Sequence, residues 1–171
     1  MTLAVLETLR LSLRRLTLAD APFMLELLND PSFIRHIGDK GVRSIEGAEA
    51  YLRDGPLASY QQFGFGLMLV RLKDEETPIG ICGLIKRETL QDVDVGFAYL
   101  PAFRGQGYAI EATRAVLAYG KRQFGLSRIV AIVAPGNASS IRVLEKAGLE
   151  FERMIRAEDG TDVQLLAREM D

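Results

Sequence analysis

A glycine-containing turn at residues 104–109 constrains the fold of this chain more than any other feature of its sequence. It lies between an apolar segment, 92–100, that is typical of a strand and a segment, 107–124, with the periodicity of a helix. A turn of small residues leaves backbone N–H groups exposed where a helix begins, and the helix dipole is positive at that end. The sequence therefore predicts a site for the phosphate or diphosphate of a phosphorylated cofactor.

Two common phosphate-binding motifs do not explain this turn. A dinucleotide-binding Gly-x-Gly-x-x-Gly motif counted from Gly105 requires glycine at position 110, which is Ile. No Gly-x-x-x-x-Gly-Lys-Ser/Thr run occurs in the chain. What remains is the run Arg104-Gly-Gln-Gly-Tyr-Ala109, an Arg-x-x-Gly-x-Ala pattern. Its structural alternative is an ordinary surface turn between a strand and a helix.

The N-terminal part of the chain indicates one strand followed by two helical segments. Residues 10–18 alternate between apolar and polar side chains, as in a half-buried strand. Asp20 can cap a helix, which the run 29–31 (Asn-Asp-Pro) ends. Ser44 precedes a second helical stretch, which Gly55-Pro56 interrupts.

From residue 64 onward the periodicity is mostly that of strands. Strands are expected at 65–70, 79–85 and 92–100, and their short connections predict an antiparallel meander. After them come a helix at 107–124 that stops at Gly125, a strand at 128–133, a short helix between Asn137 and Gly148, and strands at 149–157 and 162–168. The order β-α-α-β-β-β-α-β-α-β-β predicts an α+β (α/β) fold. Its mixed, mostly antiparallel sheet has about seven strands and is flanked by about four helices.

Composition and charge limit the class of protein. A chain of 171 residues suits a single domain spanning 1–171. Its formal net charge of −2 argues against a nucleic-acid partner. Residues 1–9 lack a basic leader, and no apolar run approaches the ~20 residues that cross a bilayer, so we expect no signal peptide and no membrane partner. With one cysteine, Cys82, and one histidine, we expect no disulfide, no metal site and a cytoplasmic location.

A second motif follows the strand at 128–133. The run Asn137-Ala-Ser-Ser140-Ile-Arg-Val-Leu-Glu145-Lys146-Ala-Gly148-Leu is similar to an Asn-x-x-Ser-x-x-x-x-Glu-Lys-x-Gly-Phe signature. With Asp94-Val-Gly-Phe97, Gly107-Tyr-Ala-Ile-Glu111-Ala and the order of elements, it makes residues 10–169 resemble the GNAT N-acetyltransferase superfamily. The resembled branch contains the ribosomal-protein alanine N-acetyltransferases. In GNAT proteins the pattern found at 104–109 binds the diphosphate of acetyl-CoA.

The resemblance implies acetyl-CoA as a co-substrate. In GNAT proteins two strands splay apart and the pantetheine arm of the cofactor lies between them; here these are 92–100 and 128–133. Gly105 and Gly107 lack a Cβ, which permits close approach to the diphosphate. The implied cofactor-binding residues are Phe97, Ala98, Tyr99, Leu100, Arg104, Gly105, Gln106, Gly107, Tyr108, Ala109, Asn137 and Ser140. For Arg104 the alternative is a solvated surface arginine, and for Asn137 a helix cap, a role compatible with cofactor contact.

The implied reaction is direct acetyl transfer to a primary amine, on a protein N-terminus or a small molecule. A base must accept a proton from the amine, and an acid must protonate the departing thiolate. Asp94 is the first candidate for the base and Asp92 the second; the alternative is an exposed acidic pair on a strand. By the resemblance Ser140 is the candidate acid, with a hydrogen bond inside its own helix as the alternative.

Two positions depart from the family pattern. Many GNAT enzymes have a tyrosine acid where this chain has Leu144, and some have a glutamate base where it has Ile132, so neither role transfers. Cys82 alternates within an apolar strand and is expected in the core, because direct transfer needs no nucleophilic cysteine. His36, expected in a loop, could line the acceptor entrance, although a lone loop histidine is usually a surface residue.

Three functions remain open on the sequence alone. The leading one is an acetyl-CoA-dependent N-acetyltransferase, and the resemblance allows a monomer or a homodimer. The second is a non-catalytic acyl-CoA-binding or regulatory module on the same fold. The third is a nucleotide-binding protein that uses the same turn and binds ATP or NAD instead of CoA. Release of CoA in the presence of candidate amines separates the first from the second.

Overall fold

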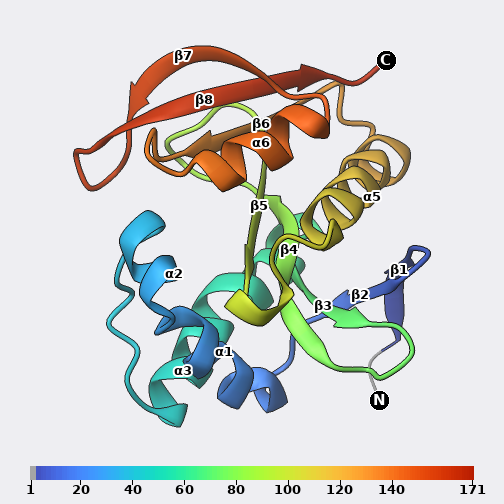
Figure 1. Cartoon of the computed structure of the whole chain (residues 1–171), viewed down its shortest axis with the longest axis vertical. Helices are drawn as coiled ribbons and strands as arrows, with labels where there is room; N and C mark the ends of the chain where they lie inside the picture. The colour runs from blue at the N-terminus through green and yellow to red at the C-terminus, as the bar shows by residue number, and fades with distance from the viewer. Residues whose placement is uncertain (1–2) are drawn as a thin grey trace.

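The strands form one mixed sheet in the computed structural model, which describes residues 3–171. The sheet has eight strands in the order β1-β2-β3-β4-β5-β6-β8-β7, and every neighbouring pair is antiparallel except β5 and β6. Figure 1 shows β7 and β8 at the end of the sheet opposite β1 to β3. The strands are β1 (Ala4–Glu7), β2 (Leu11–Arg15), β3 (Leu67–Leu72), β4 (Pro78–Ile85), β5 (Asp94–Tyr99), β6 (Arg128–Val133), β7 (Glu150–Arg156) and β8 (Asp162–Glu169).

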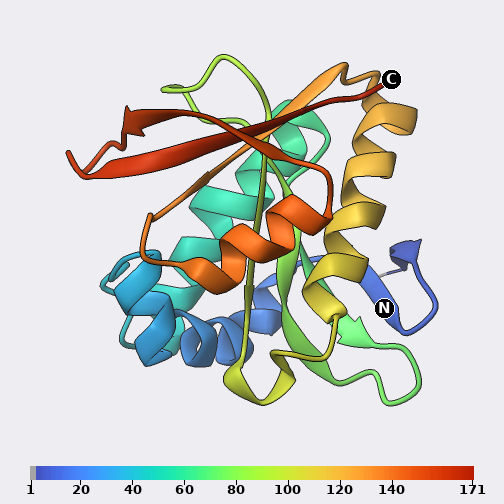
Figure 2. The same ribbon diagram turned by 45° about the horizontal axis from the view of Figure 1, so that its top comes forward.

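Helices cover both faces of this sheet. In Figure 2, α5 and α6 lie on one face of the central strands, and the segment of α3 and α4 lies on the other. Across residues 3–171, no helix has the length and apolar character needed to cross a membrane. The helices are α1 (Ala21–Leu28), α2 (Pro31–His36), α3 (Ile45–Leu52), α4 (Ala58–Phe63), α5 (Tyr108–Phe124) and α6 (Ala138–Lys146), with 3-10 turns η1 (Leu18–Asp20) and η3 (Pro101–Phe103) and a π-helical turn η2 (Arg53–Leu57).

Two apolar clusters fill the space between the sheet and its helices, because successive side chains of a strand point to opposite faces. Val70 and Cys82 belong to the cluster that packs against α5 and α6. Leu69 and Ile81, their neighbours along the same strands, belong to the cluster under α1, α2 and α3. Cys82 is fully buried, so the expectation that it is a core residue is confirmed.

Two elements were not predicted from the sequence. The strand β1 lies within 1–9, and it raises the sheet from about seven strands to eight. The helix α2 begins at Pro31, where only the end of α1 was expected. Asp30 caps α2 by accepting the N–H of Phe33 at 3.2 Å, and proline suits the first helical position because its missing N–H would have no partner there.

The strands β5 and β6 separate soon after they meet. Their parallel register contains the single pair Asp94 and Val130, and the N–H of Val130 donates to the carbonyl of Val93 at 3.0 Å. From Val95 to Tyr99, β5 has no further register partner on β6 among the described residues. The predicted splay of these two strands is therefore present.

Candidate active site

The turn at 104–109 joins the end of β5 to the start of α5. Gly105 has φ 75° and Gly107 has φ 84°, backbone conformations that favour glycine. Within residues 3–171 the N–H groups of 105–110 donate to no acceptor, whereas the N–H of Glu111 donates to the carbonyl of Gly107 at 3.1 Å. A run of free N–H groups at the positive end of a helix is an arrangement suited to an anion such as diphosphate.

Arg104 contacts protein groups instead of extending freely toward the turn. Its Nε and Nη2 donate to the Tyr99 carbonyl at 3.0 and 2.6 Å, and Nη2 lies 2.9 Å from Oδ2 of Asp30. Burial alone would raise the pKa of Asp30, but hydrogen bonds from Ser32 and Arg104 lower it overall. Arg104 thus ties the end of β5 to the start of α2, and its contact with phosphate stays a prediction.

The edge of β5 beyond Asp94 faces the gap left by β6. In an antiparallel pair, alternate residues direct both backbone groups to the same neighbour. The N–H of Leu100 donates to the carbonyl of Ile79 on β4 at 3.0 Å. The backbone N–H and C=O groups of Leu100 and Ala98 therefore point toward β4. The carbonyl of Val93 bonds to β6, so Phe97 and the N–H of Tyr99 face the gap. Of the four residues predicted to bind pantetheine, Phe97 thus presents its backbone groups to the gap and Tyr99 presents its N–H, because Arg104 occupies the Tyr99 carbonyl.

A cleft of 1270 Å³ opens beside this edge. Its walls come from α2, α3, α4, the ends of β4 and β6, β5, α6 and the hairpin of β7 and β8. The turn residues 104–109 are not part of its lining. His36 lines it too, from the last position of α2 and not from a loop as the sequence predicted. The predicted site residues that it brings together are Asp94, Phe97, Ala98, Asn137 and Ser140.

Asp94 is the first residue of β5, and its side chain is 1% exposed. The Nε of Arg87 lies 3.2 and 3.3 Å from its two carboxylate oxygens. Burial raises the pKa of Asp94 to about 6, and the neighbouring Arg87 cation opposes that rise. A carboxyl group with this pKa is mostly ionised at neutral pH. Its pKa is also closer to that of an effective general base than the pKa of an exposed aspartate is.

Asp92, the second candidate base, has a different environment. The strand begins at Asp94, so Asp92 lies in the preceding loop. Its carboxylate pairs with the Nε of Arg128 at 3.0 Å, and the same guanidinium also pairs with Glu152 and Glu169. Asp92 does not line the cleft. The structure therefore gives it a place in a surface ion-pair cluster and leaves Asp94 as the acidic candidate at the site.

The helix α6 contributes the other candidate residues. The Oδ1 of Asn137 accepts the N–H of Ser140 at 3.4 Å, which confirms Asn137 as the cap of this helix. Both residues also line the cleft, so the capping hydrogen bond leaves part of the Asn137 surface available to a ligand. Leu144 and Ile132 line the same cleft with apolar side chains, and at these positions the chain therefore offers neither an acid nor a base.

Sequence comparison decides the family. The acetyltransferase (GNAT) domain matches residues 10–150. This chain belongs to the GNAT acetyltransferase family. The uncharacterized N-acetyltransferase YnaD of Bacillus subtilis (strain 168) is 30% identical over 147 residues, which cover 86% of this GNAT chain and 83% of the relative.

Solved structures share the GNAT fold. RimL, a ribosomal L7/L12 alpha-N-protein acetyltransferase in complex with coenzyme A, superposes with a TM-score of 0.85 at 18% identity and 98% coverage of both chains. The microcin C7 self immunity acetyltransferase MccE, in complex with acetyl-CoA and AMP, has a TM-score of 0.79 at 16% identity and covers 95% of this chain and 94% of its own. The GNAT fold and the N-acetyltransferase class expected from the sequence are confirmed.

Two residues of the GNAT cleft were missed by sequence reasoning. Arg87 follows β4 and reaches Asp94, seven positions along the chain. Tyr51 lines the cleft from α3, and burial raises the pKa of its hydroxyl. The Lys86-Arg87 pair that ends an apolar strand was a usable signal for Arg87. Tyr51 had none, because its helical spacing is that of a core residue.

Proposed function

We propose that this GNAT protein transfers an acetyl group from acetyl-CoA to a primary amine of a protein N-terminus or a small molecule. The observation that carries the proposal is the path of the chain from Asp94 to the start of α5. The strand β5 leaves β6 at Asp94 and leads, through η3, into the turn of free N–H groups. An extended ligand with a diphosphate at one end can therefore add to the edge of β5 and place its other end beside Asp94.

In this proposal the turn and α6 hold the co-substrate while Asp94 and Ser140 handle protons. Acetyl-CoA supplies the thioester. The neutral amine attacks the acetyl carbon, so that a C–N bond forms and the C–S bond breaks. Asp94 accepts the amine proton, directly or through water. The hydroxyl of Ser140 gives its proton to the departing sulfur and recovers one from solvent.

The lining of the cleft carries both signs of charge. Arg35 and Lys40 line it from the segment of α2, and Asp54 and Glu158 line it from η2 and the hairpin of β7 and β8. This mixture favours neither strongly basic nor strongly acidic acceptors. The proposal therefore keeps both protein N-termini and small amines, in a cytoplasmic monomer or homodimer.

The deciding experiment is a thiol-release assay with acetyl-CoA and a panel of amines. The panel contains amino acids, polyamines, aminoglycosides and peptides with free N-termini, and mass spectrometry identifies the acetylated product. We expect CoA release that depends on at least one amine. Calorimetric binding of CoA without acetylation of any amine would favour the non-catalytic module. Binding of ATP or NAD without binding of CoA would favour the nucleotide-binding alternative.

A further inference from the structure

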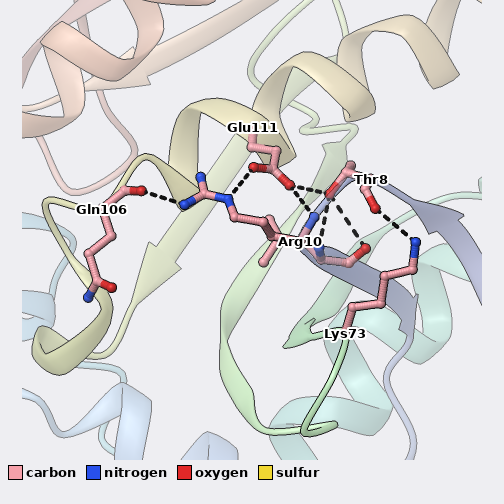
Figure 3. Close-up of polar contacts among 6 residues, drawn as sticks. Thr8, Arg10, Lys73, Gln106 and Glu111 are labelled. Carbon is pink, nitrogen blue, oxygen red and sulfur yellow. Dashed lines mark hydrogen bonds and ion pairs between the residues drawn. The ribbon is translucent and has the colours of Figure 1, made fainter.

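The first turn of α5 is fastened to the loop between β1 and β2 by Glu111 (Figure 3). Its Oε2 accepts from the Thr8 hydroxyl and from the N–H of Arg10, the latter at 2.9 Å. Its Oε1 accepts from Nε of Arg10 at 2.7 Å. Burial alone would raise the pKa of Glu111, but these hydrogen bonds lower it overall. The carboxylate is therefore stabilised in its charged form and holds Arg10 in one orientation.

The guanidinium of Arg10 in turn contacts the glycine turn. Its Nη1 donates to the carbonyl of Gln106 at 2.9 Å, and its Cζ lies 4.4 Å from the centre of the Tyr108 ring. A Cβ on Gly107 would lie 3.1 Å from Nη2. Figure 3 shows Arg10 between Gln106 on one side and Glu111 on the other. One side chain thus links the middle of the turn to the helix that follows it.

This contact fixes the direction of one backbone donor. The peptide bond is planar and trans, so its C=O and N–H point in opposite directions. Because Arg10 holds the carbonyl of Gln106, the N–H of Gly107 points away from the guanidinium, and it has no acceptor within residues 3–171. A rotation of this peptide would turn the N–H toward a cation and away from a ligand on the open side.

We propose that Arg10, held by Glu111, is a positioning residue that orients the peptide between Gln106 and Gly107 so that its N–H binds the diphosphate of the acetyl donor. The inference rests on the proposed function, because it requires a donor with a diphosphate. The loop of β1 and β2 is then part of the cofactor site although it does not line the cleft. A merely structural bridge would affect every acetyl donor equally, and this difference provides the test.

The test compares acetyl-CoA with S-acetylpantetheine, which has the thioester but no diphosphate. In Arg10→Met we expect kcat/KM for acetyl-CoA to fall about 10-fold, mainly through KM. The reason is the loss of about one charge-assisted hydrogen bond, the one from the N–H of Gly107 to the diphosphate. The kcat/KM for S-acetylpantetheine is expected to stay at the wild-type value. Calorimetry should show the same loss of affinity for CoA and none for pantetheine.

Lys73, in the turn between β3 and β4, provides a matched control because it contacts the same loop of β1 and β2. Its Nζ donates to the Thr8 carbonyl at 3.0 Å and lies 3.6 Å from Glu7, without contact to the turn. Lys73→Met should leave the preference for acetyl-CoA unchanged. Arg10→Lys should behave like Arg10→Met, because a single ammonium group cannot bridge Gln106 and Glu111. The double variant Arg10→Met/Glu111→Gln should lose no more than the larger of the two single losses.

The outcomes separate this inference from the proposed function. An Arg10→Met enzyme that keeps the full preference for acetyl-CoA, or that loses activity equally with both donors, overturns the positioning role alone. A wild-type enzyme that acetylates amines equally well from both donors overturns the diphosphate site and the inference with it. A wild-type protein that neither binds CoA nor transfers acetyl overturns the proposed function first.

Discussion

At the scale of single residues, burial and the pairing with Arg87 set the pKa of Asp94, the proposed base. Burial raises the pKa of Asp94 to about 6, while the guanidinium 3.2 Å away keeps it from rising further. Burial and the neighbouring cation thus shift the pKa in opposite directions. Together they leave a carboxylate that is ionised at neutral pH yet basic enough to accept a proton.

We expect kcat/KM to fall as the pH decreases through about 6, because Asp94 must be ionised to act as a base. Asp94→Asn should remove this decrease from the profile of kcat/KM against pH and lower kcat by about 100-fold. Arg87→Met should move the decrease, which is the acid limb of the profile, to higher pH, because the cation that favours the charged carboxylate is lost. Rate profiles against pH measure all three. A limb that persists unchanged in Asp94→Asn would assign the base elsewhere.

Unfolding measurements provide the control for Asp94→Asn. Burial raises the pKa of Asp94 in the folded protein above that of an exposed aspartate, so the stability contributed by the protonated carboxyl is lost as the pH rises through about 6. Asparagine does not ionise, and the variant should therefore be no less stable than the wild type above pH 7. Loss of activity without loss of stability would point to chemistry.

Ser140→Ala should lower kcat while leaving the KM for acetyl-CoA close to the wild-type value. The hydroxyl is proposed to act on the departing sulfur, whereas the bond that caps α6 uses the N–H of Ser140, which alanine keeps. We expect a decrease of about 10-fold to 100-fold in kcat. Steady-state kinetics with a saturating amine measures it, and an unchanged kcat would remove the serine from the mechanism.

At the scale of elements, the two glycines that bound α5 offer a matched pair of variants. Gly107 has φ 84° and Gly125 has φ 64°, so alanine at either position should lower stability by about 1 kcal/mol. A Cβ at Gly107 would also lie 3.1 Å from Arg10, while a Cβ at Gly125 has no neighbour within 4 Å. We expect Gly107→Ala to weaken CoA binding about 10-fold or more and Gly125→Ala to leave it unchanged. Equal CoA affinities for the two variants in calorimetry would count against the turn as the diphosphate site.

The elements that sequence reasoning placed correctly are those with local signals. Gly125 ends α5, Asn137 caps α6, and the pattern of 92–100 yields β5 with a shift of its start to Asp94. The strand β1 has a single buried residue, Leu6, so hydropathy gives it no clear alternation. For α2, Pro31 can either follow one helix or open the next, and the chain uses it for the second purpose.

The candidate site was likewise predictable only where its residues carry local sequence signals. The glycine turn, Asp94, Asn137 and Ser140 lie in contiguous motifs that resemble those of the GNAT family, and their roles in the reaction stay predictions. The contact of Arg10 with Glu111 could not be predicted, because 101 positions separate the two residues and only the packing of the loop between β1 and β2 against α5 brings them together. The direction of the β5 backbone groups likewise depends on the register with β4, which single-sequence patterns do not specify.

At the scale of the whole molecule, the sheet consists of two parts that meet at one point. The strands β1 to β5 and the strands β6, β8 and β7 are each paired along their lengths, but the register joining them holds the single pair of Asp94 and Val130. Side chains of α5 and α6 complete the junction through the shared apolar cluster. A ligand that adds to the open edge of β5 would therefore bridge the part of the sheet with the fewest backbone hydrogen bonds.

This architecture predicts a large effect of CoA on thermal unfolding. At a CoA concentration of about 100 times Kd, binding to the folded state adds about 2.7 kcal/mol, which raises Tm by roughly 5–10 °C for a chain of this size. Pantetheine, which can occupy the β5 edge but not the turn, should raise Tm less at equal concentration, and ATP should not reproduce the effect. Differential scanning calorimetry over a CoA series measures the shift. If Tm did not depend on CoA concentration, neither the strand edge nor the turn would be a binding surface for this ligand.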